Sequence, residues 1–252
     1  MGKFKQSILL FMLCSFAAIA QNKTIVPTSG AIVFSCKSII HDQGLYDKSK
    51  KEFSKALVNS LKEEIVIEQQ LKGLVVDTVK INQHFKNNGH AITQLFESEV
   101  LNKSDYTIHH EFKDSIATKH ETRNGSATSF LEINTKTRIF KNEFTEDYYD
   151  YSDNTIIDIT EFKKETKTIH NYKCFKVIYT YREADVSDFS TLMSNYKTTR
   201  EMWVTDKIKT NLHPIVNDRE IISKYYPLEI TETSEMSKGK TTHYKIESCT
   251  LK

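Results

Sequence analysis

The side chains of this sequence that could do chemistry are its nine histidines, four cysteines and several pairs of carboxylates. His109 and His110 are neighbours in a segment that has the composition of a β-strand, so their side chains point to opposite faces and cannot chelate one metal ion together. His84 and His90 flank a predicted turn, but no carboxylate or cysteine stands at a metal-ligand spacing nearby. We therefore predict no metal site and interpret the histidines as solvated strand residues.

Nucleophilic catalysis has no recognisable motif here. A serine hydrolase usually carries its nucleophile in a Gly-x-Ser-x-Gly turn, and this motif is absent from a sequence that has only 7 glycines. Cys174 lies in the middle of a predicted strand, which suits a packed residue better than a reactive thiolate. Neither a Gly-x-Gly-x-x-Gly fingerprint nor a phosphate loop occurs. We predict no catalytic residue and no cofactor, and keep an envelope hydrolase as the enzyme alternative because glycosidase carboxylates can be far apart in sequence.

One stretch, residues 143–153, combines acidic residues with three tyrosines, Tyr148, Tyr149 and Tyr151. Such a stretch is more often the connection of a hairpin than a catalytic pair of carboxylates. Tyrosine provides rigid, amphipathic contact area. These three residues are therefore the surface that we predict for a protein partner.

Three cysteines follow residue 20: Cys36, Cys174 and Cys249. An odd number in an exported protein indicates either one disulfide and a remaining thiol, or three buried thiols. A bond between Cys36 and Cys249 would tie the first predicted strand to the last, and it is the pairing that we prefer. Three thiols packed as small hydrophobic residues are about equally well supported.

The segment from 49 to 71 has the spacing of an amphipathic helix. Its apolar residues lie three or four apart, while lysines and glutamates fill the opposite face. Gly73 supplies a C-terminal stop. We expect the face that carries Phe53, Leu57 and Leu61 to pack on a sheet and to border any ligand trough there.

Most of the remaining chain has the alternation and the β-branched and aromatic content of strands. The predicted strands are 30–40, 75–81, 91–96, 106–112, 129–140, 154–160, 172–181, 202–208, 228–233 and 241–249. A shorter helical segment is expected at 216–225. Because a sheet of about nine strands tends to curl, the sequence predicts a mainly β (α+β) fold. It consists of one large curved antiparallel sheet, a half-barrel, with one long and one short helix packed on its concave side.

Residues 1–20 have the features of a cleavable signal peptide. Lys3 and Lys5 precede an apolar run, and Ala18-Ile19-Ala20 is a small-x-small cleavage site. The run is shorter than the roughly 20 apolar residues that cross a membrane, so an uncleaved anchor is the less favoured alternative. We expect an exported protein that is periplasmic, outer-membrane associated or secreted. Residues 21–252 would form a single β-rich domain with no integral membrane span.

The charge balance excludes one class of partner. Removal of residues 1–20 would leave equal numbers of basic and acidic residues. Lysine and glutamate are interspersed along the chain, whereas a nucleic-acid-binding domain carries a clustered basic surface. We therefore predict no nucleic-acid partner.

Residues 165–231 contain motifs that resemble those of a known family. Glu165-Thr-Lys-Thr-Ile-His-Asn-Tyr-Lys-Cys-Phe-Lys176 is similar to E-T-K-x-I-x-G-Y-K-C-x-K, and Met202-Trp-Val-Thr-Asp-Lys-Ile208 resembles x-W-V-T-x-x-I. The family consists of exported proteins of unknown function from Bacteroidetes-type bacteria. It is related to the GLPGLI family and, more distantly, to LolA/LolB-like half-barrel envelope proteins. This chain departs from the pattern, since Gly-Leu-Pro-Gly-Leu-Ile is absent and Asn171 stands where glycine is usual. The resemblance implies a β-rich envelope protein and brings no catalytic residues.

Two functions fit these observations. The favoured one is an envelope protein that binds a hydrophobic ligand, a lipid or lipopeptide, in the trough of the curved sheet. A completely filled core would use the same residues. The alternative is a periplasmic or surface module that binds an envelope protein through a sheet edge or residues 143–153.

Overall fold

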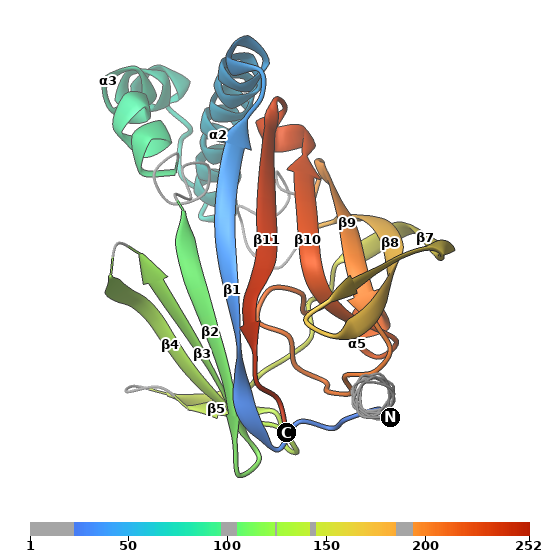
Figure 1. The fold of residues 1–252 in the computed structure, drawn as a ribbon. Helices are drawn as coiled ribbons and strands as arrows, with labels where there is room; N and C mark the ends of the chain where they lie inside the picture. The colour runs from blue at the N-terminus through green and yellow to red at the C-terminus, as the bar shows by residue number, and fades with distance from the viewer. Residues whose placement is uncertain (1–22, 97–104, 124, 142–144, 185–193) are drawn as a thin grey trace, which may run out of the picture.

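The chain folds around a single antiparallel sheet (Figure 1). The computed structural model describes residues 23–96, 105–123, 125–141, 145–184 and 194–252, so the predicted signal peptide lies outside the described residues. Within this part of the chain the sheet has 11 strands in the order β6-β5-β4-β3-β2-β1-β11-β10-β9-β8-β7. The first strand therefore lies at the centre, between the second and the last.

The elements have the following bounds. The strands are β1 (Ser29–Ile40), β2 (Tyr106–Lys113), β3 (Ile116–Arg123), β4 (Ser126–Asn134), β5 (Ile139–Lys141), β6 (Glu146–Tyr148), β7 (Thr155–Ile169), β8 (Tyr172–Arg182), β9 (Lys197–Thr205), β10 (Tyr226–Ser234) and β11 (Lys240–Cys249). The helices are α2 (Gln43–Leu71), α3 (Thr78–Phe96), the short α5 (Arg219–Ile222) and the 3-10 helix η2 (Glu235–Ser237).

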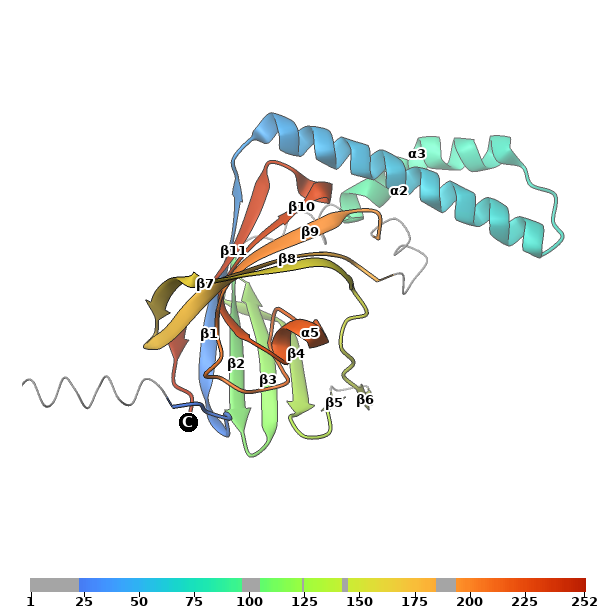
Figure 2. The same cartoon turned by 90° about the vertical axis from the view of Figure 1, so that its right-hand side faces the viewer.

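The sheet curves so that its inward side chains form the core. In β1, alternate residues Ile32, Phe34 and Cys36 are buried, as expected for a strand with one face on a core. The main hydrophobic cluster combines this face with the inward faces of β8, β9, β10 and β11 and with residues of the 206–225 segment. Figure 2 shows the sheet bending around this segment, with α5 inside the curve. The predicted fold class, a curved antiparallel half-barrel, is confirmed.

Helix α2 begins six residues before the predicted start at residue 49. Asp42 caps it, because its side chain accepts a hydrogen bond of 2.9 Å from the backbone N–H of Leu45. The helix crosses one end of the curved sheet and then projects beyond it together with α3 (Figure 2). The backbone at Gly239 packs closely against the start of α2. A Cβ at this position would lie only 2.5 Å from the carbonyl oxygen of Asp42, so only glycine fits.

The strands predicted at 75–81 and 91–96 are wrong, because most of this region forms helix α3. Asp77 starts the helix by accepting a hydrogen bond of 3.0 Å from the N–H of Lys80. Ile81 and Phe85 are buried at a helical spacing of four, and Lys62 of α2 lies over the ring of Phe85. Packing against α2 therefore overrides the β-branched composition of the segment.

Several other elements differ from the prediction. Strand β7 continues to Ile169, beyond the predicted end at residue 160, and β9 spans Lys197–Thr205 where 202–208 was predicted. The helix predicted at 216–225 is only the four residues of α5, and β6 was not predicted. Strand β3 was not predicted, because its sequence Ile-Ala-Thr-Lys-His-Glu-Thr-Arg has only two apolar residues. The predicted strand 129–140 is divided into β4 and β5 by a turn in which Arg138 has a φ of 57°.

The connection between α2 and α3 carries a cluster of exposed apolar side chains. Leu71 is 84% exposed, Val75 93% and Val79 77%. These residues lie at the end of the helical hairpin that projects from the sheet. No helix in the described part of the chain is long and apolar enough to cross a membrane.

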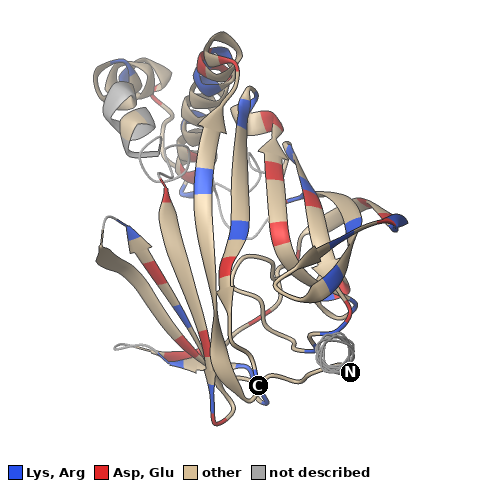
Figure 3. Ribbon diagram, viewed as in Figure 1, with Lys and Arg blue, Asp and Glu red and all other residues tan. Residues whose placement is uncertain are grey.

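Acidic and basic residues are interspersed over the strands. Figure 3 shows both signs of charge on the same strands and on α2. Several of these charges form ion pairs on the sheet, such as Lys176 with Glu165 at 2.8 Å. The mixed surface agrees with the even balance of charges in the sequence.

Candidate ligand-binding cavity

The inner face of the sheet borders a cavity of about 580 Å³. This volume lies within the range of small-molecule sites, roughly 300–1,000 Å³. The lining comes from six strands, η2 and the 206–218 segment. It comprises Tyr106, Ile108, Lys119, Glu121, Tyr181, Glu183, Thr198, Arg200, Pro214, Ile215, Glu232, Ser234, Met236, Ser237, Lys240, Thr242 and Tyr244.

Strand register brings a row of polar side chains to this cavity. Arg200 of β9 lies opposite Tyr179 of β8 and opposite Glu232 of β10. Glu232 in turn lies opposite Thr242 of β11, and the Thr242 hydroxyl is 3.2 Å from that of Ser38 in β1. Directly opposed residues of neighbouring strands point to the same face. The row therefore runs across five adjacent strands of the inner face.

Arg200 is the central cation of the cavity, with only 12% of its side chain exposed. Its Nε–H donates to Glu232 at 2.6 Å, and Nη1 donates to the Tyr179 hydroxyl at 2.9 Å. Nη1 also lies 3.9 Å from a carboxylate oxygen of Asp218. The other terminal nitrogen, Nη2, has no hydrogen-bond acceptor among the residues that the structure describes. It does not belong to the fully buried side-chain atoms that lack a hydrogen-bond partner. Its N–H groups are therefore available to an acceptor in the cavity that Arg200 lines.

The protonation states of these groups follow from their surroundings. Burial alone would lower the pKa of Arg200, but Tyr181, Glu232 and Tyr179 outweigh it and raise this pKa well above its ordinary value. Burial is also the main cause of the raised pKa of the Tyr181 and Tyr244 hydroxyls. The cavity therefore combines a permanent guanidinium cation with neutral phenols that can donate or accept hydrogen bonds.

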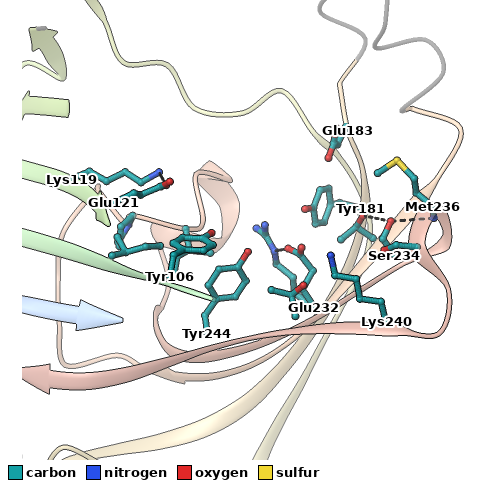
Figure 4. A pocket seen from close by; sticks show the side chains of 17 residues that line it. Tyr106, Lys119, Glu121, Tyr181, Glu183, Glu232, Ser234, Met236, Lys240 and Tyr244 are labelled. Carbon is teal, nitrogen blue, oxygen red and sulfur yellow. Dashed lines mark hydrogen bonds and ion pairs between the residues drawn. The ribbon is translucent and has the colours of Figure 1, made fainter. Parts of the chain in front are cut away.

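Tyrosine rings form much of the cavity wall. Tyr106 of β2 and Tyr244 of β11 both lie opposite Cys36 of β1, and their hydroxyls interact. Figure 4 shows this pair at one side of the cavity and Tyr181 at the other, with Glu232 between them. Such rings give flat apolar contact area that ends in a polar hydroxyl.

The remaining charged groups of the lining are balanced in sign. Lys119 and Glu121 form an ion pair of 2.6 Å with both side chains largely buried. Lys240 and Glu183 add one charge of each sign. The cavity is thus of mixed polarity, in contrast to the apolar trough that we expected from the sequence.

A second cavity of about 570 Å³ adjoins the first and shares Tyr181, Glu183, Arg200 and Ile215 with it. Asp218 lines this second cavity and is only 2% exposed. Its carboxylate accepts hydrogen bonds from the side chains of Ser152, Asn154 and Tyr179. Asp218 therefore fixes the segment that follows residue 150 against β8, next to Arg200.

The predicted helix residues do not line the main cavity. Phe53 and Leu57 are 1% and 2% exposed. The Phe53 ring contacts the ring of Tyr196 with centroids 5.4 Å apart. Leu61 is only partly buried. Phe53 and Leu57 are thus residues through which α2 packs on its neighbours, and they do not line the cavity.

The three tyrosines of the predicted partner surface are not displayed together. Tyr148 is 50% exposed. Tyr149 and Tyr151 instead face Arg138, whose guanidinium carbon lies 5.2 Å and 3.7 Å from their ring centroids. A single exposed ring remains from the predicted cluster.

The predicted Cys36–Cys249 disulfide is wrong, because register separates the two residues. Cys36 lies opposite Tyr244, whereas Cys249 lies opposite Ile32. Four residues along β1 correspond to roughly 13 Å, and a disulfide needs Cα atoms within about 7 Å. Among the described residues no cysteine forms a disulfide. Burial raises the pKa of the Cys174 thiol to about 12, so it is a packed thiol.

The histidines vary in environment more than predicted. His110 and His213 are 2% and 3% exposed. Neither ring nitrogen of His110 has a hydrogen-bond partner among the described residues. The structure describes no group of three or more His, Cys, Asp or Glu side chains that could hold a metal ion.

Arg200 and Glu232 were not predicted from the sequence. The sequence did contain an indication of Arg200. The inward-facing residues of β9 are Thr198, Arg200, Met202 and Val204, and the arginine is the one cation among side chains that are otherwise buried and uncharged. A charge at an inward position of a half-buried strand needs a partner. Its partner could not be identified from spacing, because the pairing depends on strand register.

Comparisons with known proteins give one structural match. No family model and no curated protein matches this chain. The crystal structure of the Mycobacterium tuberculosis lipoprotein LppX matches with 6% sequence identity and a TM-score of 0.31, over 94% of this chain and 97% of that one. The resemblance of residues 165–231 to an exported family therefore stays a prediction.

Proposed function

We propose that this protein is an exported binding protein that holds a small amphipathic ligand in the cavity of its curved sheet. The observation that supports this most directly is the 580 Å³ cavity around Arg200, with its tyrosine wall. Export is inferred from the signal-peptide pattern of residues 1–20.

The amphipathic character follows from the lining. Arg200, Glu232 and the phenol hydroxyls supply directional hydrogen bonds. Ile108, Pro214, Ile215 and Met236 supply apolar area. Sites for small molecules commonly combine apolar walls with a few placed polar groups. A ligand with one polar end and one apolar part satisfies both kinds of surface, whereas a pure hydrocarbon would leave the Arg200 donors without an acceptor.

The partner-module alternative has less support. Arg138 holds Tyr149 and Tyr151 against the body of the protein. The edge strand β7 is interrupted by a bulge between Phe162 and Thr166 that contains Lys163 and Lys164. Bulges and lysines on an edge strand disfavour pairing with another chain.

Native mass spectrometry of the mildly extracted protein and displacement of an apolar fluorescent probe test the proposed function. Ile215 lines both cavities, so Ile215→Trp should fill part of the space and weaken probe binding at least tenfold. Ile157→Trp is the matched control, because Ile157 is an exposed residue of β7. A wild-type protein that binds no probe and carries no ligand, or equal binding by the two variants, would refute a ligand site in this cavity.

A further inference from the structure

Arg200 has unused hydrogen-bond donors, whereas nearby carboxylates compensate its positive charge. Nε and Nη1 are bonded to Glu232 and Tyr179, whereas the two N–H groups of Nη2 meet no acceptor among the described residues. Buried or half-buried guanidinium donors are strongly favoured to find acceptors. A ligand that enters this cavity can supply one.

The charge of that acceptor is constrained by the carboxylates already present. Glu232 lies 2.6 Å and Asp218 3.9 Å from nitrogens of the same guanidinium. Lys119, the other cation at the Tyr106 side, is already paired with Glu121. A ligand carboxylate or phosphate would therefore be a third anionic group around one cation, and like charges at close range disfavour ionisation.

An uncharged acceptor avoids this repulsion. The carbonyl oxygen of an ester or amide can accept a hydrogen bond from Nη2 and brings no proton that needs its own acceptor. Tyr181 and Tyr244 add phenol hydroxyls beside it. The apolar part of such a molecule has Ile108, Ile215 and Met236 to contact.

We infer that the ligand is uncharged and that it presents an ester or amide carbonyl to Nη2 of Arg200, with its apolar chain in the cavity. This inference rests on the proposed function and specifies the chemical class of its ligand.

The test compares four probes of equal chain length on the purified protein: a dodecanoyl monoglyceride, dodecanoate, dodecylamine and dodecanol. Each competes with the apolar fluorescent probe at pH 7.5, below its micelle concentration. The monoglyceride should bind at least tenfold more tightly than dodecanoate and dodecylamine, and more tightly than dodecanol. Dodecanoate or dodecylamine binding as tightly as the monoglyceride would overturn the inference.

Two variants examine the two parts of the argument. Arg200→Lys keeps a cation beside Glu232 but removes Nη2, so the affinity for the monoglyceride should fall about tenfold relative to the affinity for dodecanol. Glu232→Gln removes one of the two anions, so the affinity for dodecanoate relative to the monoglyceride should rise about tenfold. An unchanged affinity ratio in both variants would overturn the inference.

The failure of this inference is distinguishable from that of the proposed function. Binding of the fluorescent probe that is blocked by Ile215→Trp, together with a preference for dodecanoate, leaves a ligand-binding protein with a different ligand class. Absence of all binding to the wild-type protein removes the proposed function as well. Because the preference is measured on the wild type first, it does not depend on the folding of any variant.

Discussion

Two arginines lie inside this protein, and their surroundings differ. Arg138 is 3% exposed, and all three of its side-chain nitrogens donate to protein oxygens. Nε bonds to the carbonyl of Tyr149 at 2.8 Å, Nη1 to the carbonyl of Asn211 at 2.6 Å and Nη2 to the side chain of Asn217 at 3.2 Å. Arg200 instead faces carboxylates, lines a cavity, and has one nitrogen, Nη2, with no acceptor among the described residues.

The difference separates a structural role from a binding role. Arg138 connects Tyr149, Asn211 and Asn217, which all lie outside the helices and strands. Each of its side-chain nitrogens donates a hydrogen bond. Arg200 has its charge compensated while its hydrogen-bonding capacity is incomplete. Burial alone would not distinguish the two residues, whereas an inventory of donors and acceptors does.

The largest expected effect concerns the structural arginine. Arg138→Met should lower the free energy of unfolding by about 3–5 kcal/mol, because it leaves the partly buried carbonyls of Tyr149 and Asn211 without this donor. Denaturant unfolding measures this loss. Arg219→Met is the control, since the guanidinium carbon of exposed Arg219 lies 5.6 Å from the ring centroid of Tyr151, and its loss should cost less than about 1 kcal/mol. Equal costs for both variants would contradict the assigned role of Arg138.

A slightly smaller loss of stability is expected for a substitution in α2. It tests whether this helix packs as part of the core or lines the cavity. Leu57→Asp should cost about 3–4 kcal/mol, because it places a carboxylate at a site that is 2% exposed. Val75→Asp on the exposed hairpin end should change stability by less than about 0.5 kcal/mol. Thermal melting and probe binding are both measured. A Leu57→Asp protein that melts normally but loses the probe would assign α2 to the binding site.

The buried histidines differ from the two arginines in charge, because burial keeps their rings neutral. Burial lowers the pKa values of His110 and His213 to about 3, from 6.5. Between these values the unfolded chain binds more protons than the folded one, so stability falls as pH falls below 6.5. The loss is about 3 kcal/mol for each histidine at pH 4.

Urea unfolding at pH 7.5, 5.5 and 4 measures this dependence. His110→Leu should reduce the acid-induced loss, whereas His109→Leu, on the opposite face of the same strand, should not. Identical pH profiles for wild type and His110→Leu would show that His110 is not buried as a neutral ring.

The smallest effect on stability is expected at the binding arginine. Arg200→Lys should lower the free energy of unfolding by only about 1–2 kcal/mol, because the ammonium group can still pair with Glu232. Its effect on ester binding should be larger than its effect on stability. A stability loss as large as that of Arg138→Met would remove the distinction between the two arginines.

The fold class could be predicted because the alternation of apolar residues is local. Strands β1, β2, β8 and β11 begin and end within about one residue of their predicted bounds. Helix α3 could not be recognised from composition, because valines surround its first turn. Asp77 followed by Ile81 and Phe85 is the pattern that would have indicated it.

The site could not be predicted because it depends on strand register. Arg200 and Glu232 are 32 residues apart, and they meet only because β9 and β10 pair in one specific register. The register between β1 and β11 likewise places Cys36 and Cys249 too far apart for the disulfide that strand order alone suggested. Sequence patterns predict the faces of strands, whereas cross-strand partners require the whole sheet.

The central position of β1 has a consequence for the synthesis of this protein. One neighbour, β2, starts at Tyr106, but the other, β11, starts only at Lys240. A nascent chain therefore carries an incomplete central strand until β11 has been synthesised, and contacts so distant in sequence form slowly. The unpaired backbone of β1 is a site for mispairing during that interval. Chaperones that bind extended segments would protect this chain before its last strand emerges.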